Sequence, residues 1–137
     1  MYRVKINAAR PDYRVFIDLL YGNERDVDTD GNSIPVNSRN WTCLYIKDRD
    51  GGDPCLNIFA CDSDETRFEV TSDAPQLEEL AALYLYLYCG SVITYIDKNL
   101  IFEDIQKLKD LYASQLRRAE NSIWHKSTNV APYPNRA

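Results

Sequence analysis

One short stretch of the sequence carries residues whose type and spacing suit metal chemistry. It reads DVDTDGNS, and its three aspartates, Asp26, Asp28 and Asp30, alternate along the backbone and run into Gly31. An EF-hand calcium loop begins in the same way, with oxygen ligands at positions 1, 3 and 5 and glycine at position 6. The three aspartates are therefore the candidate metal ligands of this chain.

The residues that follow do not complete an EF-hand. Position 8 of the loop would be Ser33 instead of an apolar residue, and position 12 would be Asn37, which cannot supply the bidentate carboxylate. Pro35 interrupts the second half of the loop. A looser site of oxygen ligands and a solvated acidic turn both stay open, and no cofactor is expected.

Patterns for catalysis are weak. His125 is the only histidine, and it is expected on the surface near a helix end, where a cation suits the helix dipole. The glycines are scattered, and there is no phosphate-binding loop, nucleophile elbow or cysteine–histidine cluster. Asp62 and Asp64 form an acid pair of a kind that is common in turns. We therefore expect binding rather than catalysis, while an enzyme that uses only carboxylates and tyrosines stays open.

The charge of the chain favours a basic protein as partner. The net charge is −5 and the isoelectric point about 4.8, which argues against nucleic acid, because neutralising phosphates requires clustered lysine and arginine. The acids are concentrated between residues 24 and 79, where fourteen of them face five bases. An acidic surface attracts basic proteins and cations, although acidity also serves solubility alone.

The cellular setting is expected to be the cytoplasm. The first residues, MYRVKINAARPDYRV, contain no apolar run of signal-peptide length, and no segment of the chain is long and apolar enough to predict a membrane span. The four cysteines (Cys43, Cys55, Cys61 and Cys89) lie in apolar surroundings without a C-x-x-C pair, so we expect reduced thiols in the core.

Apolar alternation predicts an antiparallel or mixed sheet of five to six strands. Residues 2–7 alternate cleanly, and similar patterns cover 41–47, 55–61, 66–70 and 91–96, with short turns between several of them. Residues 12–21 fit both a strand and a helix, and their valine, phenylalanine and isoleucine favour a strand. Residues 22–40 are rich in turn formers and are expected to form a loop.

Two helices are expected to pack on one face of this sheet, which gives an α+β class. The first lies within residues 71–90, with Ser72 or Asp73 as a cap and Gly90 as the stop, and it should be buried on most sides. The second runs from about residue 99 to 125 as one long amphipathic helix of roughly 40 Å. Residues 1–126 are expected to form a single domain, followed by a disordered tail at 127–137.

Strand order suggests where the acidic residues meet. Alternate turns of a meander emerge at the same end of a sheet, so the loop at residues 26–30 and the turn at 62–65 are expected together, with the turn at 48–53 at the other end. Carboxylates brought so close repel one another unless something positive neutralises them. Exposed aromatic residues beside them would anchor a partner. The predicted binding residues are Asp26, Asp28, Asp30, Trp41, Tyr45, Asp62, Asp64 and Glu65.

The leading hypothesis is a small non-catalytic module that masks a basic site on a partner protein, in the manner of an inhibitor or a toxin-immunity protein. A second hypothesis is a structural or assembly subunit that forms a homodimer through the long C-terminal helix, with Leu108, Leu116 and Ile123 at the interface. A third is a divalent-metal-dependent enzyme or sensor that uses the aspartate-rich loops.

Overall fold

The computed structural model describes residues 1–22, 27–31, 39–48 and 55–126. Within these residues the chain forms seven strands and five helices. In chain order they are β1 (Tyr2–Ile6), α1 (Val15–Leu20), β2 (Val27–Gly31), β3 (Cys43–Asp48), β4 (Cys55–Cys61), β5 (Asp64–Ser72), α2 (Pro75–Cys89), β6 (Gly90–Tyr95), β7 (Lys98–Asn99), α3 (Phe102–Leu111), α4 (Ala113–Glu120) and α5 (Ile123–Lys126).

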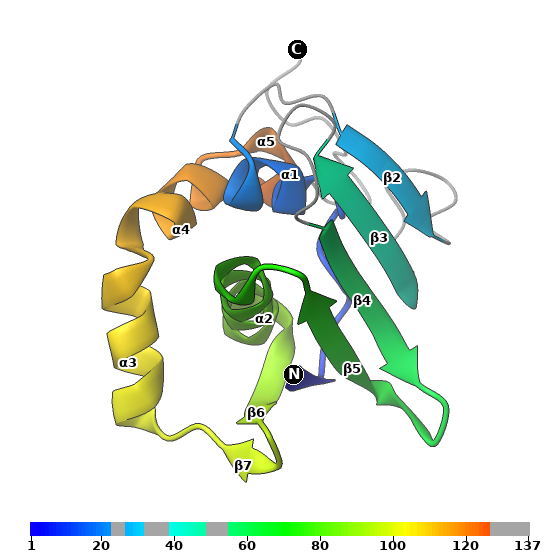
Figure 1. Cartoon of the computed structure of the whole chain (residues 1–137), viewed down its shortest axis with the longest axis vertical. Helices are drawn as coiled ribbons and strands as arrows, with labels where there is room; N and C mark the ends of the chain where they lie inside the picture. The colour runs from blue at the N-terminus through cyan, green and yellow to red at the C-terminus, as the bar shows by residue number, and fades with distance from the viewer. Residues whose placement is uncertain (23–26, 32–38, 49–54, 127–137) are drawn as a thin grey trace.

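All seven strands belong to one antiparallel sheet, with the order β2-β3-β4-β5-β1-β6-β7 (Figure 1). The α+β class is therefore confirmed. The sheet is one strand larger than the upper expectation, since β2 lies in the stretch predicted as a loop and β7 is only two residues long. β1 pairs with both β5 and β6, so the N-terminal strand lies inside the sheet.

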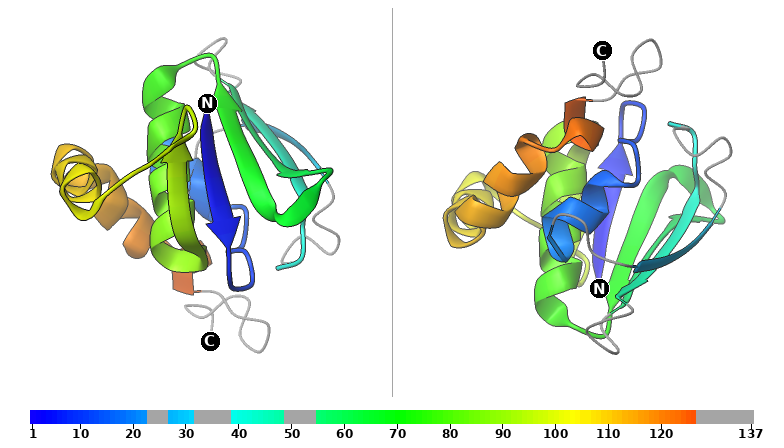
Figure 2. Two further views of the ribbon diagram at one scale, coloured as in Figure 1. Left: turned by 90° about the horizontal axis from the view of Figure 1, so that it is seen from below. Right: turned by 90° about the horizontal axis from the view of Figure 1, so that it is seen from above.

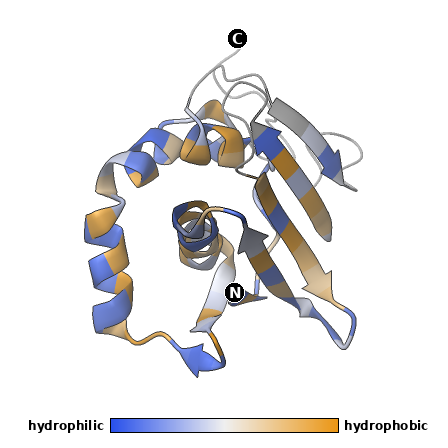
Figure 3. Cartoon of the chain, in the orientation of Figure 1, coloured by the Kyte–Doolittle hydropathy of each residue, from blue (hydrophilic) through white to orange (hydrophobic). Residues whose placement is uncertain are grey.

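The helices lie on one side of the sheet, in two layers. α2 packs against β1, β5 and β6, and α1 lies beside α2. α3 and α4 form an outer layer beyond α2 and α1 (Figure 2). The other, open face of the sheet has no helix over it among the described residues (Figure 2), and hydrophobic and hydrophilic residues are interspersed along the strands (Figure 3).

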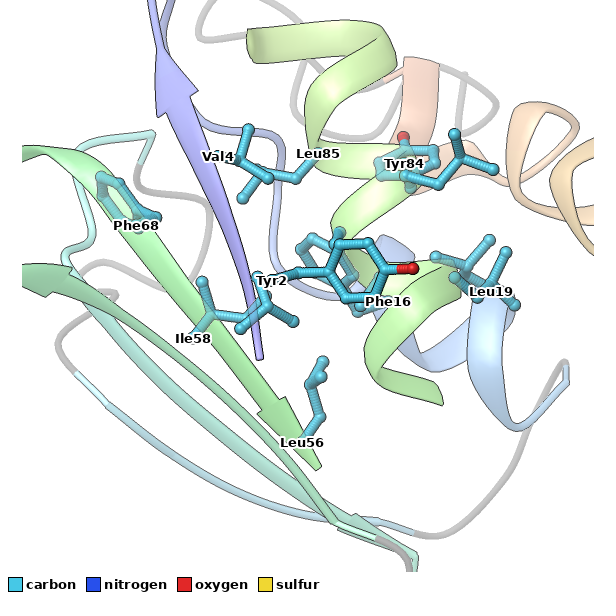
Figure 4. Close-up of a cluster of buried hydrophobic side chains, with 14 of the residues drawn as sticks. Tyr2, Val4, Phe16, Leu19, Leu56, Ile58, Phe68, Tyr84 and Leu85 are labelled. Carbon is cyan, nitrogen blue, oxygen red and sulfur yellow. The ribbon is translucent and has the colours of Figure 1, made fainter. Parts of the chain in front are cut away.

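The core forms between the inner sheet face and α2. Strand alternation points Val4, Ile58 and Phe68 inward, and each of them is fully buried (Figure 4). α2 contributes buried side chains on most of its surface, from Leu80 to Leu85, as the sequence predicted. Burying one such apolar side chain contributes about 1.5–3 kcal/mol, so this interface is the main source of stability.

The ends of α2 follow the predicted signals only in part. The N-terminal residue is Pro75, and the capping position belongs to Ala74 instead of Ser72 or Asp73. Ser72 still contributes, because its Oγ accepts a hydrogen bond from the Ala74 backbone N–H at 3.1 Å. Gly90 ends the helix as expected. A Cβ at this position would lie 2.7 Å from Cγ1 of Val4, so the turn into β6 needs glycine.

Residues 12–21 contain a helix, so the strand prediction for them was wrong. α1 begins after Asp12, whose carboxylate accepts hydrogen bonds from the Arg14 backbone N–H at 3.1 Å and from its guanidinium Nε at 2.9 Å. The buried positions Val15, Phe16 and Leu19 recur at helical spacing and face the core. Burial of these three side chains favours the helix more than the intrinsic preference of valine, phenylalanine and isoleucine favours a strand.

The long C-terminal helix predicted for residues 99–125 is divided into α3, α4 and α5, so it does not project as a single rod (Figure 1). The first break falls at Tyr112, whose backbone leaves the helical region at φ −106° and ψ 23°. Its hydroxyl donates to Oε1 of Glu79 in α2 at 2.7 Å. Ser122, in the second break, donates to Oδ2 of Asp18 in α1 at 2.5 Å. These contacts wrap the chain around the domain.

The hairpin between β6 and β7 has an unusual turn. Tyr95 pairs with Lys98, so Ile96 and Asp97 are the two central residues, and both have positive φ values of 47° and 61°. Two positive values are typical of a type I′ turn, which favours asparagine and glycine at these positions. A β-branched residue is strained there, and the Ile96 side chain is also 68% exposed.

Candidate functional site

The acidic stretch forms the outermost strand of the sheet. Asp28 lies opposite Lys47 and Asp30 opposite Tyr45 in the β2–β3 register. The Asp30 side chain is exposed, and its Oδ1 accepts the backbone N–H of Gly31 at 2.8 Å. Asp26 lies outside the described residues. Acids are depleted in strands, so a strand at this place has no clear signal in the sequence.

Because β2 is a strand, its two acids, Asp28 and Asp30, do not gather with those of the β4–β5 turn. β2 starts opposite Asp48, so Asp28 lies toward the end of the sheet that was expected to hold the other acidic turn. Asp30 pairs with Tyr45, and Tyr45 pairs in turn with Asn57 of β4. Asn57 lies four residues before Cys61, the end of β4, so Asp30 is roughly 13 Å from that end along the strand direction. Asp28 and Asp30 are thus spread along an edge, which corrects the expected convergence.

The acids of the β4–β5 turn are solvated. Asp62 and Glu65 are exposed. Oδ1 of Asp64 accepts hydrogen bonds from the Thr66 hydroxyl at 2.6 Å and from its backbone N–H at 3.0 Å. These hydrogen bonds hold the pKa of Asp64 below its ordinary value. Asp64 therefore shapes the start of β5 as an ionised side chain.

The two aromatic residues predicted to anchor a partner lie in different surroundings. Trp41 precedes β3 and is fully buried, with its indole N–H donating to the Pro11 carbonyl at 2.9 Å. Its ring packs edge-on against Phe16 and Phe68. Tyr45 is half-buried on the open face of the sheet. Trp41 is therefore a core residue, and only Tyr45 stays accessible on the candidate surface.

A small cleft lies at the exposed end of β2. It encloses about 180 Å³, and its lining comes from Tyr13, Thr29, Asp30, Gly31 and Leu44. Gly31 has φ +147°, and a Cβ there would lie 2.3 Å from the Cys43 carbonyl oxygen. Glycine at this position lets β2 approach β3 closely and places Asp30 beside the cleft. The lining thus brings exposed Asp30 of β2 together with one aromatic residue, Tyr13, and one aliphatic residue, Leu44.

The described residues contain no group of three or more histidine, cysteine, aspartate or glutamate side chains arranged to hold a metal. The four cysteines are thiols, and they do not share the core environment that was expected for them. Cys89 is buried, which raises its pKa to about 11, whereas Cys43 is exposed and Cys55 and Cys61 are half-buried.

His125 was predicted to lie on the surface, but it is half-buried. Nδ1 of its ring lies 2.6 Å from the Tyr84 hydroxyl.

The apolar residues proposed as a dimer interface contact other parts of the same chain. Leu116 is buried, and Leu108 and Ile123 are half-buried.

A carboxylate that the sequence did not single out lies in the larger hollow beneath α3. Glu79 accepts hydrogen bonds from the hydroxyls of Tyr2 at 2.5 Å and Tyr112 at 2.7 Å. It lines a hollow of about 420 Å³ with Tyr95, Leu100 and other residues of the β6–β7 hairpin and α3. The sequence gives no signal for this group, because its partners are 77 and 33 residues away.

Within the described parts of the chain, no helix is both long and apolar enough to cross a bilayer. Comparisons with protein-family models, with curated proteins and with solved structures find no match for this chain.

Proposed function

We propose that this protein is a non-catalytic protein-binding module that accepts a basic side chain of an extended partner segment at the β2 edge. The observation that carries the proposal is the cleft of about 180 Å³ in which exposed Asp30 lies beside Tyr13 and Leu44. A lysine or arginine side chain has an aliphatic stem and a charged head. The stem would contact Tyr13 at the cleft, and the head would meet the exposed Asp30 carboxylate at the β2 edge.

The position of β2 supports an extended segment as the partner. β2 is the last strand of the described sheet, and its residues pair with β3 on one side only. An outermost strand has alternate backbone N–H and C=O groups directed away from the sheet, and another chain can pair with them. Alternate side chains of an added strand lie on one face, so one of them can enter the cleft while the backbone pairs with β2.

The binding free energy would come from two kinds of contact, the salt bridge to Asp30 and the main-chain and apolar contacts. A salt bridge to an exposed carboxylate contributes only about 0–1 kcal/mol, so Asp30 would provide specificity and attraction more than affinity. Main-chain pairing and the apolar walls would supply the rest. The net charge of −5 would speed the approach of a basic partner, and salt would screen that attraction. A module of this kind would mask a basic functional site, as inhibitors and immunity proteins do.

Short peptides test the cleft directly. The probes are acetylated and amidated Thr-Val-Xaa-Val-Thr peptides with lysine, arginine or glutamine at the centre, titrated into the isotope-labelled full chain. We expect the basic peptides to shift the amide resonances of Thr29, Asp30 and Gly31. Asp30→Asn should weaken their binding by about three- to fivefold, the effect of losing one exposed ion pair.

Asp62→Asn is the matched control, because it removes the same charge from an exposed turn outside the cleft. Equal losses for the two variants would assign the effect to overall charge and contradict a defined site. Equal binding of the glutamine peptide would contradict recognition of a basic side chain. At the level of the partner, the association rate should fall steeply with added salt, and a flat rate would argue against steering by charge.

A further inference from the structure

The open face of the sheet contains a second hollow, which is distinct from the β2 cleft. It encloses about 190 Å³ where β5, β1, β6 and β7 lie side by side. This space corresponds to about six water-sized volumes of roughly 30 Å³ each, enough for a phosphate group and a few waters. The lining consists of Arg3, Lys5, Arg67, Val92, Thr94 and Asn99.

Two like charges stand directly opposite one another in this hollow. Lys5 of β1 pairs in register with Arg67 of β5, and both side chains are exposed. Like charges in directly opposed cross-strand positions destabilise a sheet. Neither cation has a carboxylate oxygen within 4.0 Å in the part of the chain that the structure describes. The fold therefore holds two neighbouring positive charges without a direct ion pair to the described residues, and both act at longer range on the Asp64 carboxylate.

The other polar groups of the lining also present hydrogen-bond donors. The Thr94 hydroxyl donates to Oδ1 of Asn99 at 3.1 Å, which occupies the amide oxygen and leaves the amide N–H groups of Asn99 available. Arg3 donates from Nε to Glu69 at 3.1 Å and from Nη1 to Asp97 at 3.2 Å. Its Nη2 nitrogen makes no hydrogen bond to the described residues.

The surrounding acids do not line the hollow, and each accepts hydrogen bonds from another side chain, in two cases from Arg3 of the lining. Glu69 and Asp97 are held by Arg3, as described above. Asp64 accepts its two hydrogen bonds from Thr66. Lys5 and Arg67 act on Asp64 only as smaller contributions to its lowered pKa, after those hydrogen bonds. The hollow thus combines cationic and neutral donors with no acceptor carboxylate in its lining.

From this arrangement we propose that the hollow formed by Lys5, Arg67, Arg3 and Asn99 binds a phosphate group. A tetrahedral oxyanion accepts hydrogen bonds in several directions at once, and guanidinium and ammonium groups are the usual donors to it. The anion would lie between Lys5 and Arg67, where it offsets their mutual repulsion. Because the hollow is open to solvent, it could bind either free phosphate or a phosphate monoester on a larger molecule.

Titration of the isotope-labelled full chain with inorganic phosphate tests this site, with sodium chloride at equal ionic strength as the reference. We expect phosphate to shift the Lys5, Thr94 and Asn99 amide resonances in a saturable way. Chloride should cause no saturable shift of these resonances. A parallel titration with phosphoserine distinguishes the sources. Tighter binding of phosphoserine indicates a monoester ligand, and tighter binding of inorganic phosphate indicates the free anion; each outcome supports the site.

Three charge-removing variants complete the experiment. Lys5→Gln and Arg67→Gln should each weaken phosphate binding by about tenfold, the effect of losing one charge-assisted hydrogen bond. Arg117→Gln removes an exposed positive charge from α4, away from the hollow, and should leave binding unchanged. Phosphate should also raise the melting temperature of the parent chain and of Arg117→Gln, but not of Arg67→Gln. Shifts that do not saturate, or equal binding by all three variants, would overturn the proposal.

Discussion

The hydroxyl of Tyr84 lies 2.6 Å from Nδ1 of His125, and this contact joins α2 to the last described helix. The ring of His125 also packs edge-on against Tyr84 and Tyr88. Burial among these rings lowers the pKa of His125, and nearby Lys126 lowers it further, while Glu120 acts in the opposite direction. The folded protein therefore favours a neutral imidazole at this position.

Acid should weaken the fold through this histidine. The unfolded chain binds a proton at a pKa of about 6.5, above the folded value, so the contribution is complete above that pH and is lost as pH falls. We expect the free energy of unfolding, measured in urea, to decrease from about pH 7 to pH 5. His125→Gln should flatten this dependence. An unchanged slope in the variant would assign the effect to other groups.

High pH should lower the free energy of unfolding through the ionisation of four tyrosines, Tyr2, Tyr84, Tyr88 and Tyr112. Burial raises the pKa of each, and carboxylates add to the effect, Glu79 for Tyr2 and Tyr112 and Glu120 for Tyr84 and Tyr88. Because the unfolded pKa is about 10, this stability is complete below pH 10 and is lost above it. A titration followed by phenolate absorbance should show these four tyrosines ionising only together with unfolding. Ionisation of all ten near pH 10 in the folded state would refute the assignment.

The strained hairpin offers a stabilising change. Ile96 has φ 47° and an exposed side chain, so Ile96→Asn removes strain without opening a cavity. We expect the free energy of unfolding to rise by about 1 kcal/mol, because asparagine tolerates this region far better than a β-branched residue. Chemical unfolding of the variant measures the change, with Ile96→Val as a control that keeps a β-branched residue at the same position. A loss of stability in Ile96→Asn would show that the side chain contributes a contact of its own.

A methyl group at Gly31 should displace β2 from β3. The added Cβ would lie 2.3 Å from the Cys43 carbonyl oxygen, at a backbone φ that favours glycine. We expect Gly31→Ala to cost about 1–3 kcal/mol and to weaken binding of the basic peptides, because Asp30 moves with the strand. Hydrogen exchange should show faster exchange in β2 and β3 while α2 keeps its protection. Uniform loss of protection would contradict a local effect.

Reversing one charge on the open sheet face should stabilise it. Arg67→Glu replaces the opposed pair Lys5–Arg67 with opposite charges, which is expected to add about 0.2–1 kcal/mol at low salt. The gain should shrink as salt screens the pair. Unfolding curves at two ionic strengths measure both effects. The same variant should lose phosphate binding, so higher stability accompanied by weaker binding is the combined outcome expected here.

The sequence predicted the inner layers of the fold better than its edges. Strands 55–61 and 91–96 and the helix ending at Gly90 were recognisable because apolar periodicity reports burial on a large core. β2 could not be recognised, because its alternating aspartates resemble a loop and pairing with β3 alone makes it a strand. α1 was misassigned because strand-forming residues were held in a helix by packing against α2.

The candidate sites depend on register, which no single segment encodes. Asp30 was identified by residue type, but Tyr13 and Leu44 join it only through the fold. Lys5 and Arg67 are 62 positions apart in the sequence numbering, and each is an ordinary surface residue of its own strand. Trp41 was expected on the surface with Tyr45, but it lies before β3 begins and is buried, so the alternation of the strand does not extend to it.

The guanidinium of Arg118 donates to the carbonyl oxygens of Asp18 at 2.5 Å and Leu19 at 2.9 Å, near the end of α1. A helix of six residues has too little stability to persist alone, so α1 depends on a side chain 100 positions later. During synthesis α1 can pack on Trp41 and α2 before α4 leaves the ribosome, but the two hydrogen bonds from Arg118 can form only afterwards. A nascent chain halted before α4 would therefore be expected to hold its first helix less firmly than the finished protein.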